Sequence, residues 1–204
     1  MIWPPAREPL EGSIVRMEAL RPEHRDRLRE AAADPEIWVW MDRRIPGDEG
    51  AFDRWFDTRL AASEHGGEWC FATVSIASGR PIGSSSYLAV RAEHDGLEIG
   101  WTWLNPAAWR SGANLEAKLL MMGCAFDDLG AMRIEFKTDA RNDRSRAALE
   151  GIGATYEGIF RKHMLMPIVG VRHSAYYSIT DDEWPAVREL LTARLERAAE
   201  ASRA

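Results

Sequence analysis

Residues 96–114 of the 204-residue chain have the sequence GLEIGWTWLNPAAWRSGAN, and this stretch decides the fold. Gly96–Leu104 is rich in apolar and aromatic side chains and is expected to form a strand. The segment after Asn105 is a loop that contains glycine, and beyond Asn114 apolar residues recur at helical spacing. The stretch therefore predicts a strand, a loop and a helix in succession.

The loop of this unit is a candidate site for a phosphate-bearing ligand. A helix N-terminus leaves backbone N–H groups without partners and carries a partial positive charge. Gly112 lets a ligand come close to the backbone, and Arg110 can add a full positive charge. A tight strand-to-helix turn without a ligand explains the same residues, so both interpretations stay open. The segment has neither the G-x-x-x-x-G-K-[ST] motif nor the G-x-G-x-x-G motif after a strand, and this disfavours ATP and NAD as ligands of the loop.

The segments on either side predict a mixed α/β (α+β) domain of about seven strands with flanking helices. A single domain over 1–204 is expected, with its core at about 12–185, because no linker or repeat interrupts the pattern. The expected strands are Ser13–Leu20, Glu68–Ile76, Pro81–Val90, Gly96–Leu104, 132–137, Ala154–Met166 and Val171–Ile179. The expected helices begin at Arg21 and span Ala51–Ser63, 115–129, 142–152 and 181–200.

The composition of the chain disfavours several classes of function. The net charge of −6 and the pI near 5.5 disfavour a general nucleic-acid or membrane-surface binder. No stretch approaches the roughly 20 apolar residues that a membrane span needs. Cys70 and Cys124 lie in apolar surroundings and are expected to be unlinked thiols, which fits the cytoplasm. The five histidines lack compact metal-ligand spacing, so no metal is expected.

Three segments together resemble the RimJ/RimL-type branch of the GNAT acetyltransferases. They are Leu97–Ala117, Asn142–Ser145 and Gly153–Gly158, and the likeness extends from about Gly12 to Pro185. The resemblance implies the GNAT fold and acetyl-CoA as co-substrate. The family's cofactor loop has the pattern Q/R-x-x-G-x-G/A, whereas this chain has Trp at position 109 and Asn at position 114. The departure affects side-chain contacts more than the backbone N–H donors.

The resemblance also implies which residues hold acetyl-CoA. In the family, the strand before the loop separates from the next strand and its backbone pairs with pantetheine. The loop binds the pyrophosphate, and the next helix start contacts the pantetheine arm and the sulfur. The residues at these positions are Thr102, Trp103, Leu104, Trp109, Arg110, Ser111, Gly112, Ala113, Asn114, Asn142, Ser145 and Arg146.

The expected mechanism is direct transfer of the acetyl group to an amine, without a covalent enzyme intermediate. A base must take a proton from the amine, and Glu98 is the candidate, with an exposed strand position as the alternative explanation. Ser145 is the candidate to return a proton to the leaving thiolate. Trp38, Trp40 and Trp101 are candidates to line the acceptor site, although packing in the core is the favoured explanation for any single tryptophan.

The sequence therefore predicts an N-acetyltransferase that acts on a primary amine. The acceptor is either a protein N-terminal residue, such as alanine, or a small metabolite or antibiotic amine. A non-catalytic module that binds or senses acyl-CoA is the alternative from another class. A homodimer is left open, and neither nucleic acid nor a membrane is expected as a partner.

Overall fold

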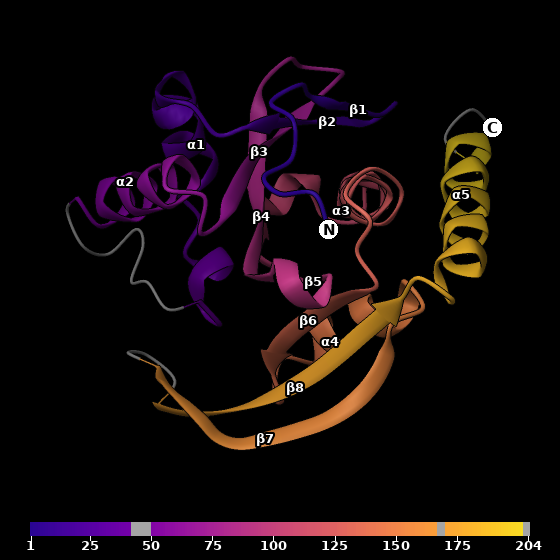
Figure 1. Cartoon of the computed structure of the whole chain (residues 1–204). Coiled ribbons are helices and arrows are strands. Elements are labelled where there is room, and N and C mark those ends of the chain that lie inside the picture. The colour runs from indigo at the N-terminus through magenta and orange to yellow at the C-terminus, as the bar shows by residue number, and fades with distance from the viewer. Residues whose placement is uncertain (42–49, 167–169, 202–204) are drawn as a thin grey trace.

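The chain folds around one eight-stranded sheet, and the computed structural model describes residues 1–41, 50–166 and 170–201 (Figure 1). The strands lie in the order β1-β2-β3-β4-β5-β6-β8-β7. Neighbouring strands are antiparallel except β5 and β6, which are parallel. The strands span Leu10–Glu11 (β1), Val15–Ala19 (β2), Trp69–Ser75 (β3), Pro81–Arg91 (β4), Gly96–Leu104 (β5), Arg133–Asp139 (β6), Thr155–Met166 (β7) and Gly170–Thr180 (β8).

Five α-helices pack around the sheet in the described part of the chain. A π-helical turn continues α3, and short 3-10 turns occupy several of the connections. The α-helices span Arg25–Ala31 (α1), Ala51–Glu64 (α2), Ala113–Gly123 (α3), Asp143–Gly151 (α4) and Trp184–Ala201 (α5). The π-helical turn spans Cys124–Asp128, and the 3-10 turns span Pro22–His24 (η1), Pro35–Trp38 (η2), Ala92–His94 (η3) and Pro106–Ala108 (η4).

These elements confirm the mixed sheet with flanking helices that the sequence predicts. The strand predicted over Gly96–Leu104 has the same bounds in the structure. The sheet has eight strands in place of about seven, because the two-residue β1 is too short to show an alternating pattern. β3 and β4, which correspond to the strands predicted over Glu68–Ile76 and Pro81–Val90, pair as an antiparallel hairpin.

Helices cover both faces of the sheet and create two cores. α1, α2 and η2 bury their apolar side chains on one face, against β3 and Trp103 of β5. α3, α4 and α5 bury theirs on the other face, against β2, β5, β6 and β8. Figure 1 shows this arrangement, with α1 and α2 on one side of β3 and β4 and with α3 and α5 on the other. The sheet therefore lies between two layers of helices.

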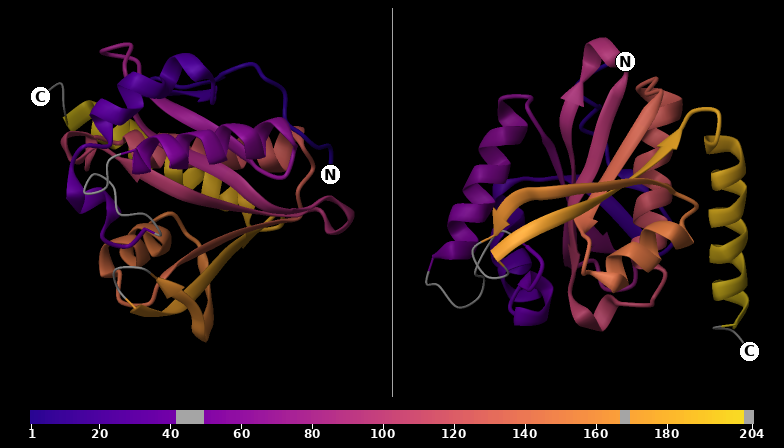
Figure 2. Two further views of the ribbon diagram at one scale, coloured as in Figure 1. Left: turned by 90° about the vertical axis from the view of Figure 1, so that its left-hand side faces the viewer. Right: turned by 90° about the horizontal axis from the view of Figure 1, so that it is seen from below.

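β5 and β6 run together for only a short distance. Their pairing is limited to Gly96–Glu98 on β5 and Arg133–Glu135 on β6, and beyond these residues the strands separate. Figure 2, left, shows strands that meet at one end of the molecule and diverge toward the other. β5 also carries one extra residue against β4 between Gly100 and Trp103, and Trp101 within this bulge has a φ of 50°. The separation leaves backbone groups of β5 facing an open space instead of a neighbouring strand.

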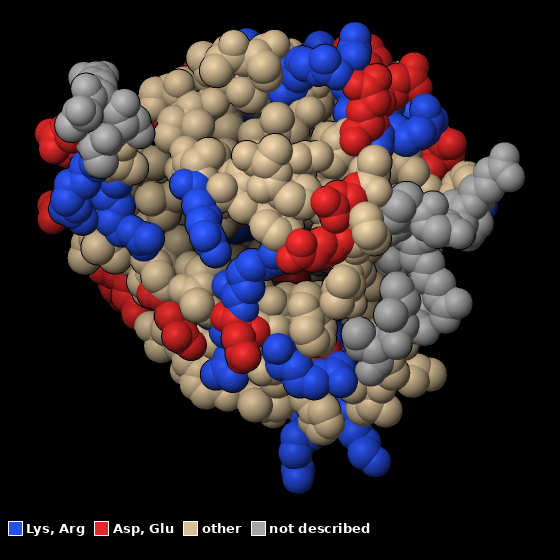
Figure 3. Space-filling model, turned by 180° about the vertical axis from the view of Figure 1, so that it is seen from behind, with Lys and Arg blue, Asp and Glu red and all other residues tan. Residues whose placement is uncertain are grey.

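Both cysteines are buried free thiols, as the sequence predicts. In the described residues, no helix is long and apolar enough to cross a membrane. On the face seen in Figure 3, acidic and basic side chains are interspersed rather than segregated by sign.

Candidate functional site

A cavity of about 840 Å³ occupies the space between the separated strands β5 and β6. Its walls come from β5, β6, the loop before α3, the first turns of α3 and α4, the η2 segment and the β7–β8 hairpin. The structure places eleven of the predicted site residues along this one cavity. They are Trp40, Glu98, Trp101, Thr102, Trp103, Leu104, Trp109, Arg110, Asn114, Asn142 and Ser145.

Glu98 lies at the point where the two strands separate. Its side chain is on the face of the sheet opposite α3, and the residue is only 3% exposed. Its carboxylate accepts a hydrogen bond from Lys137 Nζ at 2.8 Å. A Cβ at Gly100 would lie 2.9 Å from the carboxylate, so glycine at this position leaves room for it. Burial raises the pKa of Glu98 above its ordinary value of 4.5, and the charge of Lys137 opposes the shift.

A second buried ionisable group approaches the cavity from the opposite face. Lys118 of α3 is 5% exposed, and its Nζ donates to Thr102 Oγ1 at 2.8 Å. Thr102 Oγ1 also shares a hydrogen bond with Ser85 Oγ at 2.7 Å. Burial lowers the pKa of Lys118 from its ordinary value of 10.5 to about 7, and the charge of Glu98 opposes the shift. The cavity therefore holds an acidic and a basic side chain whose charged forms are both disfavoured by burial.

The loop before α3 is shaped by Gly112. Its φ is 87°, and an added Cβ would lie 2.8 Å from Ile14 Cδ1, so a larger residue does not fit without strain. The first-turn amides of α3 have no partners within the helix. Trp109 holds the loop by donating from Nε1 to the Leu104 carbonyl at 2.9 Å. The guanidinium of Arg144, from α4, lies 3.8 Å from the centre of the Trp109 ring. Trp109 thus positions a cation from another helix beside the loop.

The start of α4 forms the wall across from this loop. Asn142 caps the helix by accepting from the Ser145 backbone N–H at 3.1 Å. Both residues line the cavity and are half-buried. The cap gives Asn142 a structural role of its own at the wall of the cavity.

Five predicted site residues lie outside the walls of this cavity. Ser111 and Ala113 border a second, smaller cavity, and Gly112 acts through the backbone shape at the start of α3. Arg146 points away, because its guanidinium donates to Tyr177 Oη and the Ala140 carbonyl. Trp38 is 1% exposed and belongs to the core of the α2 face, where its Nε1 donates to the Ala32 carbonyl.

The other two tryptophans proposed for the acceptor side do border the cavity. Trp40 is half-buried with the Arg141 guanidinium 5.7 Å from its ring centre. Trp101 is half-buried with the Arg59 guanidinium 5.0 Å from its ring centre. Both rings thus border the cavity with a cation near the ring.

Five charged residues that line the cavity are absent from the predicted site: Glu36, Lys118, Lys137, Arg144 and Arg172. One signal was available for Lys118. It lies four residues after Asn114, and residues four apart share one face of a helix. A lysine on a predicted helix is ordinarily placed in solvent, so this spacing alone does not turn it inward.

Comparisons with known proteins agree with this geometry. The family model described as "Acetyltransferase (GNAT) domain" matches residues 15–155. An FsC-acetyl coenzyme A-N(2)-transacetylase of Aspergillus fumigatus is 28% identical over an alignment of 190 residues that covers 88% of this chain and 79% of that protein.

Solved structures show the same likeness. A GCN5-related N-acetyltransferase from Brucella melitensis superposes with a TM-score of 0.85 at 33% identity, over 93% of this chain and 86% of that one. A ribosomal-protein-S5-alanine acetyltransferase from Vibrio fischeri superposes with a TM-score of 0.71 at 16% identity, over 87% and 98% of the two chains, and this likeness shows the fold alone. Because the family model covers more than half of the chain and the first of these structures is similar over most of both lengths, this chain is an acyltransferase that belongs to the GNAT acetyltransferase family.

Proposed function

We propose that the chain transfers an acetyl group directly from acetyl-CoA to a primary amine of a small molecule. The observation that carries the proposal is the separation of β5 from β6 immediately after the buried Glu98, beside the start of α3. This arrangement brings a candidate base, free strand backbone and a helix N-terminus to one cavity. Acetyl-CoA supplies an acetyl group that is activated as a thioester.

The residues present suit acetyl-CoA. The first-turn amides of α3 and the left-handed Gly112 can hold a diphosphate, and the guanidinium groups of Arg110, in the loop, and of Arg144, over the Trp109 ring, add positive charge nearby. The β5 backbone at Thr102–Leu104 faces the cavity and can pair with the pantetheine amides. Asn142 can offer its side-chain amide to the same arm. Trp109 stands where the family has a polar loop residue, and it contributes to acetyl-CoA binding by holding the Arg144 guanidinium beside the loop.

Glu98 is the proposed base. An amine must lose a proton to form an amide, and a buried carboxylate with a raised pKa is a stronger base than an exposed one. Lys137 holds this carboxylate in place through the 2.8 Å hydrogen bond. Ser145 lines the opposite wall, where its hydroxyl can orient the donor or a water. No covalent bond to the protein is needed in this scheme.

A small apolar amine fits the acceptor side better than a basic protein tail does. The walls there are formed by indole rings and thioethers, including Trp40, Met41, Trp101, Met164 and Met166. Such walls suit a compact organic molecule. The Aspergillus relative is named for transfer to an N(2) atom of FsC, which supports an amine acceptor. The RimJ/RimL-like branch is part of the proposal on the strength of the motifs at Leu97–Ala117 and Asn142–Ser145.

The proposal is tested by following free thiol while acetyl-CoA is offered with a panel of small amines and with ribosomal N-terminal peptides. We expect thiol release with small amines that carry an apolar body, and little with the peptides. Thiol release with the peptides alone would indicate that the acceptor is a protein N-terminus and not a small amine. Binding of acetyl-CoA in a calorimeter without turnover for any amine would favour the non-catalytic module, and absence of binding would refute the proposal.

A further inference from the structure

Lys118 is an unusual group to find in the wall of a cavity. It lies in the middle of α3, its side chain is enclosed, and its Nζ is 5.7 Å from the centre of the Phe136 ring. Its hydrogen-bond partner is the hydroxyl of Thr102, which is held by Ser85. Within residues 1–41, 50–166 and 170–201, no carboxylate forms an ion pair with it, although a lysine ammonium can donate three hydrogen bonds.

Such a lysine is difficult to explain as a structural residue. Burial of an ammonium group without a carboxylate partner is unfavourable, and methionine or leucine would fill the same space without this penalty. The surroundings are a hydroxyl, an aromatic ring and the cavity itself. An ammonium in such a place is suited to meet a negative charge that forms in the cavity during a reaction.

The face of the sheet on which Lys118 lies indicates which reacting group carries this negative charge. Leu97, Ile99 and Phe136 face α3 and belong to the core on that side, whereas Glu98 points to the other face. Lys118 also belongs to α3, the helix whose start is proposed to bind the donor's diphosphate. The lysine therefore lies on the donor side of the separated strands, and Glu98 lies on the acceptor side.

We propose that Lys118 is the proton donor for the thiolate that leaves acetyl-CoA, a role that rests on the proposed function. As the amine nitrogen bonds to the acetyl carbon, the carbon–sulfur bond breaks and its electron pair stays on sulfur. The Nζ–H bond of Lys118 then breaks, its proton joins sulfur, and Lys118 is left as a neutral amine. Glu98 takes the proton that the acceptor nitrogen loses. Glu98 afterwards gives its proton to solvent, and Lys118 takes a proton from solvent. Both side chains thereby return to their starting protonation states.

The acidity of Lys118 suits this step. A thiol has an ordinary pKa of about 8.5, and Lys118 has a pKa of about 7 because of burial, so proton transfer from Nζ to sulfur is favourable. The charged group that acts on Lys118 is Glu98, and Glu98 is itself paired with Lys137. The hydroxyl of Ser145 is a far weaker acid than an ammonium group. Thr102 fixes the position of Nζ, so the proton is delivered from a defined place.

The first test measures Lys118 itself, without turnover. The chain has only three lysines, at positions 118, 137 and 162, so lysine labelled with ¹³C and ¹⁵N gives a spectrum that Lys118→Arg can assign. We expect Lys118 to titrate near neutral pH in the free protein. We expect the titration of Lys118 with bound coenzyme A to differ from that with bound desulfo-coenzyme A, because only the former places a thiol that can exchange a proton with Nζ. Equal titrations in the two complexes would refute the proposal.

The second test uses the single-turnover rate of thiol release. We expect Lys118→Met to lower this rate by about 10²–10³-fold, with KM for acetyl-CoA changed little and with the alkaline decline of the rate abolished. Lys118→Arg keeps the charge but cannot release a proton near neutral pH, so its rate should fall similarly. Lys162→Met, at an exposed lysine of β7, is the matched control and should behave as wild type.

These outcomes separate the two proposals. Arginine that restores the wild-type rate would show that charge alone matters and would overturn proton donation by Lys118. Wild-type rates in both variants would exclude any catalytic part for this residue. If the wild-type protein releases no thiol with any amine, the proposed function fails, whereas the difference between coenzyme A and desulfo-coenzyme A in the lysine spectrum still decides whether Lys118 faces the sulfur. Circular dichroism of each variant confirms that it is folded.

Discussion

Glu98 combines burial with an ion pair, and these two act on its pKa in opposite directions. Burial is the larger influence and places the pKa above the ordinary value of 4.5, while Lys137 limits the rise. A carboxyl that must accept a proton is useful only when it is ionised. The rate should therefore decline as the pH falls through this raised pKa, at a higher pH than an exposed glutamate would give.

Replacing Glu98 by glutamine removes the base and keeps the shape. We expect kcat to fall by about 10²–10⁴-fold and the decline of the rate on the acidic side to disappear. The measurement is the pH profile of thiol release with a small amine. Glu135→Gln is the control: Glu135 is the register partner of Glu98 on β6 and does not line the cavity, but its charge adds to the raised pKa of Glu98. This variant should keep the rate and move the acidic decline to a lower pH. A Glu98→Gln variant that kept both its rate and its acidic decline would exclude Glu98 as the base.

Individual residues also show where sequence reasoning ends. Trp38 and Trp40 are two positions apart, yet one is buried in the core and the other lines the cavity. Their residue type and spacing do not distinguish these places, because the outcome depends on how η2 packs against α2 and β5. Lys118 is similar: helical spacing puts it on the face of Asn114, but its inward position depends on the contact between α3 and β5.

At the scale of elements, the strand, loop and helix around Gly112 were predictable because each has a local signature. Alternating apolar residues give β5, and glycine followed by helical spacing gives the start of α3. The bulge of β5 was not predictable. It arises from the register with β4, where Ser86 lies opposite Gly100 but Ser84 lies opposite Trp103, and it places a tryptophan at a φ of 50°. Such a feature depends on a distant strand and has no local sequence signal.

Gly112→Ala tests the loop. The backbone there has a φ of 87°, and a Cβ would lie 2.8 Å from Ile14 Cδ1, so the loop must shift. We expect unfolding free energy to fall by about 1–2 kcal/mol and KM for acetyl-CoA to rise several-fold, because the first-turn amides of α3 move. Urea unfolding and initial rates measure the two effects.

Gly79→Ala is the matched control for the loop. Gly79 lies in the turn that connects β3 and β4 and also has a positive φ, 65°. A Cβ added there would contact no other atom. We expect a similar loss of stability with an unchanged KM for acetyl-CoA. Equal changes of KM in the two variants would mean that the loop shape at Gly112 has no part in binding the donor.

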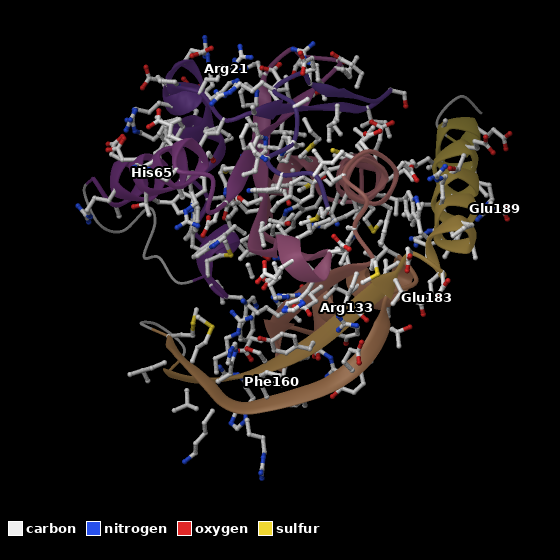
Figure 4. All side chains as sticks on the ribbon, viewed as in Figure 1. Arg21, His65, Arg133, Phe160, Glu183 and Glu189 are labelled. Carbon is white, nitrogen blue, oxygen red and sulfur yellow. The ribbon has the colours of Figure 1, made fainter. Side chains whose placement is uncertain are left out.

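One carboxylate of α3 binds the backbone at the start of β2. Glu116 accepts hydrogen bonds from the backbone N–H groups of Ser13, Ile14 and Val15 and from the Ser13 hydroxyl, at 2.6–2.8 Å. Glu116→Ala leaves these buried donors without partners, and we expect it to lower the free energy of unfolding by about 3 kcal/mol or more. The urea midpoint measures this. Glu189→Ala, on the outer side of α5 (Figure 4), is the control and should change stability little. Equal urea midpoints in the two variants would contradict the stabilising role of Glu116.

For the whole molecule, the buried Lys118 links stability to pH. In the folded chain its pKa is about 7, and in the unfolded chain it returns to the ordinary 10.5. Below pH 7 the lysine is protonated in both states, and the folded state bears the full penalty of the buried charge. Between pH 7 and 10.5 the unfolded chain binds more protons than the folded one, so unfolding free energy rises with pH. A difference of this size corresponds to a change of up to about 5 kcal/mol.

Lys118→Met should abolish this dependence. We expect the variant to be more stable than wild type at pH 6 and the difference to shrink steadily toward pH 10, because only the wild-type protein gains stability along the way. The difference between the two urea-unfolding curves at each pH removes the contribution of all other titrating groups. Lys162→Met, at an exposed position, should give a difference that does not change with pH. If the difference for Lys118→Met is also constant, the lysine keeps its charge in the folded protein and is not buried as described. A variant that is stabilised but slowed in thiol release would show that the chain carries this lysine for its chemistry at the expense of stability.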